Sequence, residues 1–113
     1  MPKTRVILEL GSGNDLHGSD YTKAALRAVQ DALHHSSLSF VRSLRLDKNK
    51  LDVDVTIGVQ RPELVNLEAV KASLPVGNVT VKAVRGGLDV ADPETNDPAI
   101  VASAAIAVRI DLE

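Results

Sequence analysis

Residues 51–60 read LDVDVTIGVQ and show the most regular alternation in the chain. Every odd position from Leu51 to Val59 is leucine, valine or isoleucine, and every even position is polar or glycine. Successive side chains of a strand point to opposite faces of its sheet, so this period of two predicts a strand that buries one face and exposes the other. The fold is therefore expected to contain a sheet with one open face.

Together with this strand, the segments on either side of it give the predicted order of elements β-α-β-β-α-β. The predicted elements are, along the chain, a strand at 5–10, a helix at about 21–34, a strand at 39–46, the strand at 51–60, a helix at 67–73, a strand at 79–84 and a final strand at 100–112. The polar turn 47–50 joins two of these strands as a hairpin, and Asn66 is the expected N-cap of the second helix. We predict an α+β fold: a ferredoxin-like split sheet, antiparallel or mixed, with an added C-terminal strand and two helices on one face.

Length and composition exclude several classes of protein. The 113 residues fit a single domain, 1–113. The net charge of −2 and a total of two aromatic residues, Tyr21 and Phe40, argue against nucleic acid as a partner. Cysteine is absent, which excludes disulfides and thiolate catalysis. No apolar stretch is long enough to span a bilayer, so we expect a cytoplasmic protein with no membrane partner.

Residues 11–18, GSGNDLHG, are predicted to form a loop between the first strand and the first helix. Glycines permit a close approach of backbone to a ligand, and a helix start offers unpaired N–H groups to an anion. The candidate ligand-binding residues are Gly11, Ser12, Gly13 and Gly18 of this loop, with Lys23 and Arg27 of the helix. The two cations lie one turn apart and would hold an anionic substrate; simple solvation is the alternative for both.

Asp15 and His17 are the candidate catalytic residues. Their i, i+2 spacing would place both side chains on one side of an extended segment. They could share a divalent cation with a third ligand, or the carboxylate could orient the imidazole as a general base. His34 is the candidate third metal ligand, particularly across a subunit boundary, although an imidazolium at a helix C-terminus also has a capping role. The alternative without chemistry is that Asp15 caps the turn and His17 bonds a backbone carbonyl.

The same eight residues resemble the G-x-G-x-D-x-H-G signature of a family of conserved hypothetical proteins, found in bacteria and, behind long extensions, in plants. The five fixed positions of that signature are all present, as Gly11, Gly13, Asp15, His17 and Gly18. The resemblance continues through 20–35 and 37–38, at 74–75, at 86–88 and in the alanine-rich final strand, so it covers nearly the whole chain. It implies membership of the family but no particular activity, because the function of that family is unknown.

The first segment is also similar to methylerythritol cyclodiphosphate synthase, in which a strand leads into G-x-D-x-H and the Asp and His bind zinc. This likeness implies metal ligation by Asp15 and His17. The third histidine ligand of that enzyme has no positional match here, and the chain is too short for the rest of it. A divalent metal, zinc or manganese, is therefore one candidate cofactor, and the cofactor is otherwise left open.

These observations favour an oligomeric small-molecule enzyme with its site in residues 11–18. A non-catalytic module that binds an anion or a metabolite at the same loop is the alternative, and a structural oligomer is another. Because the predicted helices cover one face of the sheet, the other face favours packing against copies of the chain. We therefore expect a homo-oligomer, with a trimer as one option.

Overall fold

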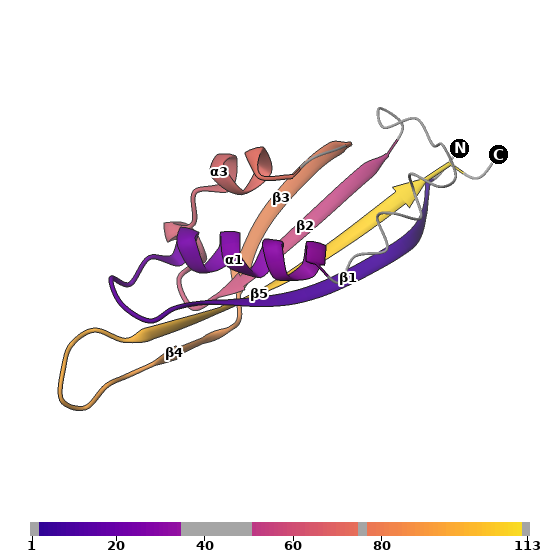
Figure 1. Ribbon diagram of the computed structural model, residues 1–113. Helices are drawn as coiled ribbons and strands as arrows, with labels where there is room; N and C mark the ends of the chain where they lie inside the picture. The colour runs from indigo at the N-terminus through magenta and orange to yellow at the C-terminus, as the bar shows by residue number, and fades with distance from the viewer. Residues whose placement is uncertain (1–2, 35–50, 75–76, 112–113) are drawn as a thin grey trace.

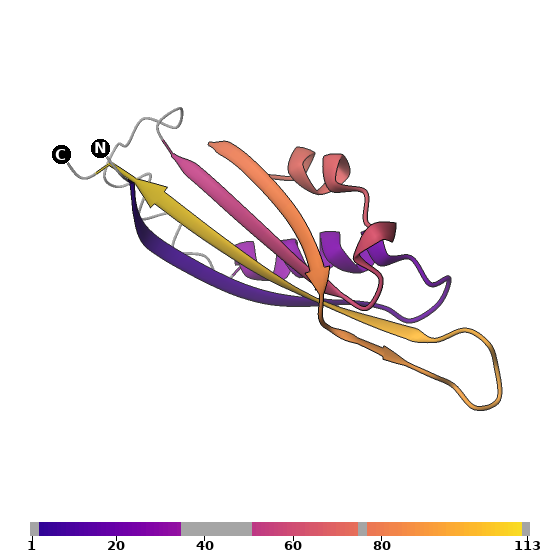
Figure 2. The ribbon, with the colours of Figure 1, turned by 180° about the vertical axis from the view of Figure 1, so that it is seen from behind.

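The computed structural model describes residues 3–34, 51–74 and 77–111. Its elements are β1 (Thr4–Asp15), α1 (Tyr21–His34), β2 (Asp52–Val59), the 3-10 helix η2 (Pro62–Leu64), α3 (Leu67–Ala72), β3 (Asn78–Arg85), β4 (Leu88–Val90) and β5 (Ala99–Ile110). They form one twisted sheet with α1 and α3 on the same side (Figure 1). Seen from behind, the sheet has no helix in front of it (Figure 2). The predicted strand at 39–46 and the turn at 47–50 lie outside the described residues.

The sheet is mixed, with the strand order β1-β5-β2-β3 and with β4 pairing to β5. β5 runs antiparallel to β1, β2 and β4, while β2 and β3 are parallel. The predicted α+β class, the mixed sheet and the placement of two helices on one face are thereby confirmed. β2 and β3, which α3 connects, are direct neighbours. The ferredoxin-like order stays a prediction, because it also involves the segment at 39–46.

The core lies between the sheet and the helices. In β5 every even residue from Ile100 to Ile110 is buried, and in β2 every odd residue from Val53 to Val59 is buried, as the alternation in the sequence predicts. The predicted cap of the second helix is confirmed as well, because the Asn66 side chain accepts a hydrogen bond from the Ala69 N–H at 3.1 Å. No helix in the described ranges is long and apolar enough to cross a membrane.

β1 is longer than the sequence predicts. Instead of ending near Leu10, it continues to Asp15, which pairs with Ile100 of β5. The prediction of a loop was therefore wrong for residues 11–15. These residues continue the pairing with β5, and glycine is needed at position 13 because α1 packs closely there: a Cβ on Gly13 would lie 2.2 Å from the backbone N of Ala28.

Gly11 makes the same kind of contact one turn further along α1. A Cβ on Gly11 would lie 2.4 Å from the backbone N of Ala32. Ala24, Ala28 and Ala32 form a row of small side chains on the buried side of α1, and the two glycines let the helix approach the strand closely. Both glycines are thus required by packing inside a strand. The turn begins only after Asp15 and includes Gly18, whose φ is +94°.

Candidate functional site

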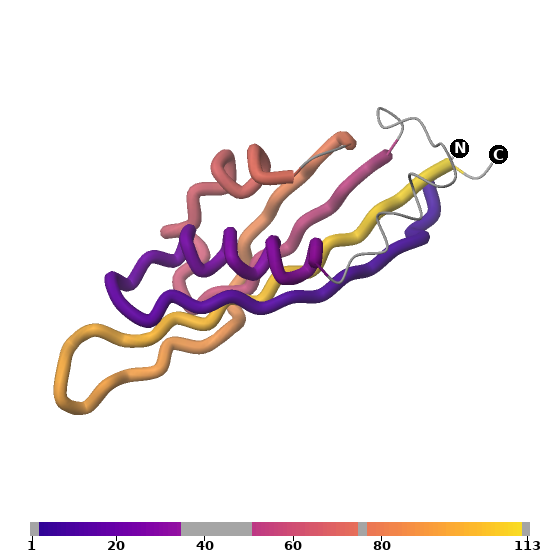
Figure 3. Tube along the Cα trace, in the orientation of Figure 1, coloured from indigo at the N-terminus to yellow at the C-terminus, as the bar shows by residue number. Residues whose placement is uncertain are grey.

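Charged side chains cluster at the end of the sheet where β1 ends and the chain continues into α1. The connection between these two elements and the loop between β4 and β5 both lie at this end of the molecule (Figure 3). The cluster contains Asp15 from β1, His17 and Gly18 from the connection, Lys23 and Arg27 from α1, and Asp97 from the β4–β5 loop. Four segments of the chain thus contribute to one site.

Asp15 has the most buried carboxylate of this cluster, with a side chain 3% exposed. Its Oδ2 accepts a hydrogen bond from the Asp20 N–H at 2.9 Å, and its Oδ1 lies 3.6 Å from Lys23 Nζ and 3.9 Å from Arg27 Nη1. The Asp20 N–H bond and the two cations lower the pKa of Asp15, although burial alone would raise it. Asp15 is therefore held as an anion at the start of α1.

His17 has a different partner. Its Nδ1 lies 3.2 Å from Asp97 Oδ2, and the Gly18 N–H donates to Asp97 Oδ1 at 3.0 Å. One carboxylate thus holds both the imidazole ring and the backbone beside it. The His17 side chain is 87% exposed, and within the described part of the chain its Nε2 has no partner.

The predicted catalytic residues are thus near one another in sequence but bonded to different groups. The prediction assumed extended backbone from Asp15 to His17, whereas β1 ends at Asp15 and a turn follows. His34 lies at the opposite end of α1, roughly 20 Å from the first residue of the helix at the usual rise per residue. Across residues 3–34, 51–74 and 77–111, no group of three His, Cys, Asp or Glu side chains is placed to hold a metal ion.

Apart from Gly18, whose N–H donates to Asp97, the predicted ligand-binding residues divide into two groups. Gly11 and Gly13 lie under α1, as described above, and the Ser12 N–H donates to Asp31 Oδ2 at 2.9 Å. Lys23 and Arg27 remain beside Asp15, with side chains 51% and 52% exposed. Arg27 Nη1 also donates to the Asn14 carbonyl at 2.6 Å. Two half-exposed cations therefore stand next to the turn that carries His17.

The sequence alone does not identify two acidic residues that contact residues 17–21: Asp97 of the site and Asp89 next to it. Asp97 belongs to an acidic loop between prolines, whose composition indicates only a solvated segment. Asp89 lies on β4, a strand that was not predicted, and its carboxylate accepts a hydrogen bond from the Tyr21 hydroxyl. Both are far from residues 11–21 in sequence, so no local spacing could have linked them to the site.

The Tyr21–Asp89 contact leads to a prediction about alkaline pH. Burial, followed by the neighbouring Asp89 carboxylate, raises the pKa of Tyr21 above its usual value of 10.0. A raised pKa means that the neutral phenol stabilises the fold below pH 10 and that this contribution is lost as the pH rises through the folded pKa. Tyr21 is the single tyrosine of the chain, so near-ultraviolet absorbance reports its ionisation directly.

We expect the phenolate to appear at a higher pH in the folded protein than in urea-unfolded protein. The Tyr21→Phe variant should lose less stability than the wild type between pH 10 and the end of that titration. Ionisation of Tyr21 at the same pH in folded and unfolded protein would contradict this prediction.

The fold and the site describe an α+β protein with a mixed sheet, helices on one face and a charged cluster at one end. The sequence matches a family described as conserved hypothetical protein, Lin0512_fam, over residues 5–108, and the chain belongs to this family. The family membership predicted from the sequence is thereby confirmed. The chain is similar to an FtsZ-like protein of unknown function from Nostoc punctiforme PCC 73102, with 37% identity, 98% of each chain covered and a TM-score of 0.84 for the crystal structure. No curated protein matches the sequence.

Proposed function

We propose that this protein is a cytoplasmic small-molecule enzyme in which His17 acts as a general base. The supporting observation is the 3.2 Å contact between His17 Nδ1 and Asp97 Oδ2, on an imidazole that is otherwise open to solvent. A carboxylate beside Nδ1 favours the tautomer with its proton on that nitrogen, which leaves a lone pair on Nε2. The same carboxylate would stabilise the imidazolium that forms when Nε2 accepts a proton.

Two half-exposed cations beside the turn that carries His17 favour an anionic substrate. Lys23 and Arg27 both lie beside the buried Asp15 carboxylate. The second carboxylate of the cluster, Asp97, is bonded to His17 and to the Gly18 N–H. The N–H groups of Asp20 and Lys23 at the start of α1 already donate to Asp15 and Asp20. A substrate carboxylate or phosphate would therefore be bound by the two cationic side chains rather than by the helix backbone.

The roles of the two predicted catalytic residues then differ. His17 would touch the substrate and take its proton. Asp15 would be a positioning residue, since it bonds the Asp20 N–H and holds Lys23 and Arg27 beside the turn. The proposed reaction class is proton transfer from a small molecule that carries an anionic group.

Hydrogen exchange in deuterated water tests the proposal even when the complete reaction is not identified. Phosphorylated and carboxylated metabolites would be incubated with the protein in D₂O, and loss of C–H signals would be followed by proton NMR. We expect exchange with the wild type and a loss of about 100-fold or more in His17→Ala, the usual scale of general-base catalysis. Asp97→Asn should lose at least about tenfold, because the imidazole loses its orienting carboxylate.

Asp92→Asn is the matched control, since Asp92 lies in the same exposed loop and accepts a bond from the Glu94 N–H. It should keep wild-type exchange. Exchange that persists in His17→Ala would remove His17 from the mechanism. Binding of an anion, seen as a thermal shift without exchange, would support the alternative of a non-catalytic binding module.

Metal content distinguishes acid–base chemistry from metal ligation at the same histidine. Purified wild type and His17→Ala would be compared by mass spectrometry. We expect no stoichiometric difference, because within the described residues no group of three His, Cys, Asp or Glu side chains is placed to hold a metal ion around His17. If zinc or manganese is stoichiometric in the wild type and lost in the variant, His17 is a metal ligand and not a general base.

A further inference from the structure

The side of the sheet opposite the helices, here called the open face, has no covering element among the described residues. Its side chains lie in rows across the strands. One row is Leu10, Ala105, Thr56 and Lys82, and the next is Ser12, Ser103, Gly58 and Val84. In β4, Leu88 pairs with Val101 and Val90 with Ala99, so these two side chains belong to the open face as well.

Large apolar side chains gather on this face. Its exposed members are Leu8 (46%), Leu10 (64%), Val84 (42%), Leu88 (61%) and Val90 (51%). Among the described residues, the exposed large hydrophobics elsewhere are Leu16, Leu64 and Leu67. An apolar surface of several neighbouring side chains on one face of a protein is typical of a contact surface.

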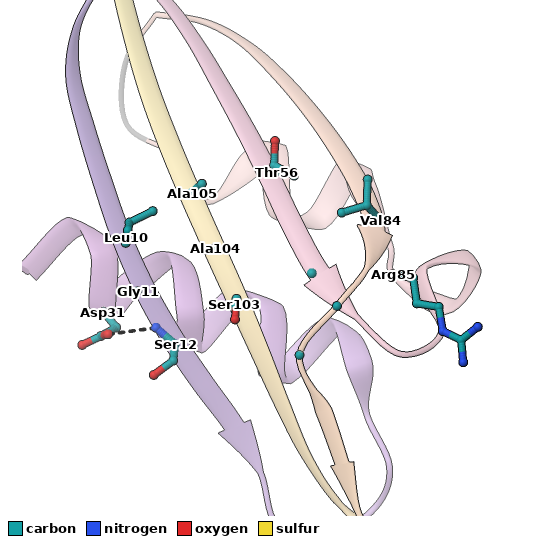
Figure 4. Close-up of a pocket in the computed structure, with 13 residues that line it drawn as sticks. Leu10, Gly11, Ser12, Asp31, Thr56, Val84, Arg85, Ser103, Ala104 and Ala105 are labelled. Carbon is teal, nitrogen blue, oxygen red and sulfur yellow. Dashed lines mark hydrogen bonds between the residues drawn. The ribbon is translucent and has the colours of Figure 1, made fainter.

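The open face is also shaped like a groove with a raised margin. Leu10 on β1 and Val84 on β3 stand at its two sides, with the small side chains of Ser103 and Ala105 between them (Figure 4). The hollow above these residues has a volume of about 620 Å³. Leu8 and Leu10 on β1, here called the leucine margin, are exposed apolar side chains. The leucine margin and the groove beside it therefore lie on the same face of one chain.

We propose that the open face is an interface between copies of this chain, in which the leucine margin of one copy enters the groove of the next. Four strands at a spacing of about 4.8 Å and a rise of about 3.3 Å per residue give the face a flat area of roughly 600 Å². Because the side chains make the face uneven, its accessible area is larger than its flat area. The accessible area is therefore close to the surface of about 800 Å² that each partner contributes to a standard interface. Homo-oligomers with closed symmetry are the commonest soluble assemblies.

Lys82 lies in the row of Leu10, and the other charges that bear on the orientation of the copies cluster at one end of the open face. Arg109 lies 2.9 Å from Asp54 and 4.0 Å from Asp52 at one end of the sheet, while Leu88 and Val90 lie at the other end. A two-fold axis perpendicular to the strands would place the charged end of one copy against the apolar end of the other. Ions are costly to bury in such a contact. An axis parallel to the strands brings the Leu88 and Val90 ends of the two copies together and their Arg109 ends together. The copies are therefore arranged about an axis parallel to the strands.

Molar mass in solution, measured by light scattering after size exclusion, tests the interface. The wild type should have at least twice the 12.0 kDa of a single chain. Leu10→Asp should lower the mass to 12.0 kDa, because a carboxylate at the margin would be buried without a partner. Leu64→Asp is the matched control: Leu64 is 53% exposed on η2, off the open face, and this variant should keep the wild-type mass.

A labelling experiment keeps the proposal testable if Leu10→Asp fails to fold. The chain has no cysteine, so Ser103→Cys introduces a single thiol in the groove, and Gln30→Cys introduces one on the exposed side of α1. We expect a maleimide to label the Gln30→Cys thiol readily and the Ser103→Cys thiol slowly. A wild-type mass of 12.0 kDa, equal labelling of both thiols, or an oligomer that Leu10→Asp leaves intact would each overturn the proposal. None of these outcomes depends on the role of His17.

Discussion

Replacing Gly13 by valine is expected to lower the free energy of unfolding by about 3 kcal/mol or more, as overpacking of a tight contact does. A Cβ at this position would lie 2.2 Å from the backbone N of Ala28 and 2.4 Å from the backbone O of Ala24. Backbone atoms inside a helix cannot rotate away as a side chain does. The variant can fold only if α1 moves off the sheet, which also weakens the alanine contacts on either side.

Urea denaturation followed by circular dichroism measures this effect. Thr4→Val is the control, because it places the same side chain at an exposed position of the same strand. It should change the free energy of unfolding by no more than about 0.5 kcal/mol. A Gly13→Val variant as stable as Thr4→Val would show that α1 does not pack on β1 as closely as described.

Replacing Asp15 by alanine is expected to cost about 2–3 kcal/mol of stability, the scale of a buried polar group left without its partner. The Asp20 N–H loses its acceptor, while Lys23 and Arg27 are half exposed and can turn to water. Asp15→Asn should cost less than Asp15→Ala, because the amide oxygen still accepts from Asp20. Asp92→Ala, in an exposed loop, is the control and should stay close to the wild type.

Asp15 should also contribute to the way the free energy of unfolding falls at acidic pH. Its pKa is lowered in the folded protein, first by the Asp20 N–H bond and then by the two cations. A lowered pKa means that its contribution is complete above the usual value of 3.8 and is lost as the pH falls through the folded pKa. Asp15→Asn should therefore flatten the loss of stability below about pH 4. An unchanged acid slope in this variant would contradict the assignment.

The strands with alternating apolar and polar residues could be predicted because the alternation itself indicates which side chains are buried. Residues 51–60 and the final strand show a period of two, and the structure confirms both as strands with one buried side. Gly11 and Gly13 indicate a loop when read locally, whereas their role depends on a helix that starts several residues later. Propensity describes the backbone at a glycine and cannot report what packs against it.

The site was predictable only in its residue types. His17 was identified from a local motif, but its partner Asp97 comes from a loop that local spacing does not connect to it. Asp15 was predicted as a catalytic residue or metal ligand, with a cap of the turn as the alternative, and its bond to the Asp20 N–H agrees with that alternative. Ligand binding by Lys23 and Arg27, metal binding and self-association stay predictions that the experiments above address.

Two hydrogen bonds between side chains of α1 and the backbone of β1 affect whether copies of the protein can aggregate at high concentration. In the described part of the sheet β1 is an edge, and edges invite foreign strands to add by backbone pairing. At Ser12 and Asn14, however, the backbone N–H and carbonyl are already bonded to Asp31 and Arg27, one helical turn apart. A foreign strand would have to displace both side chains at once. Fibrous growth is thus opposed at this stretch of β1.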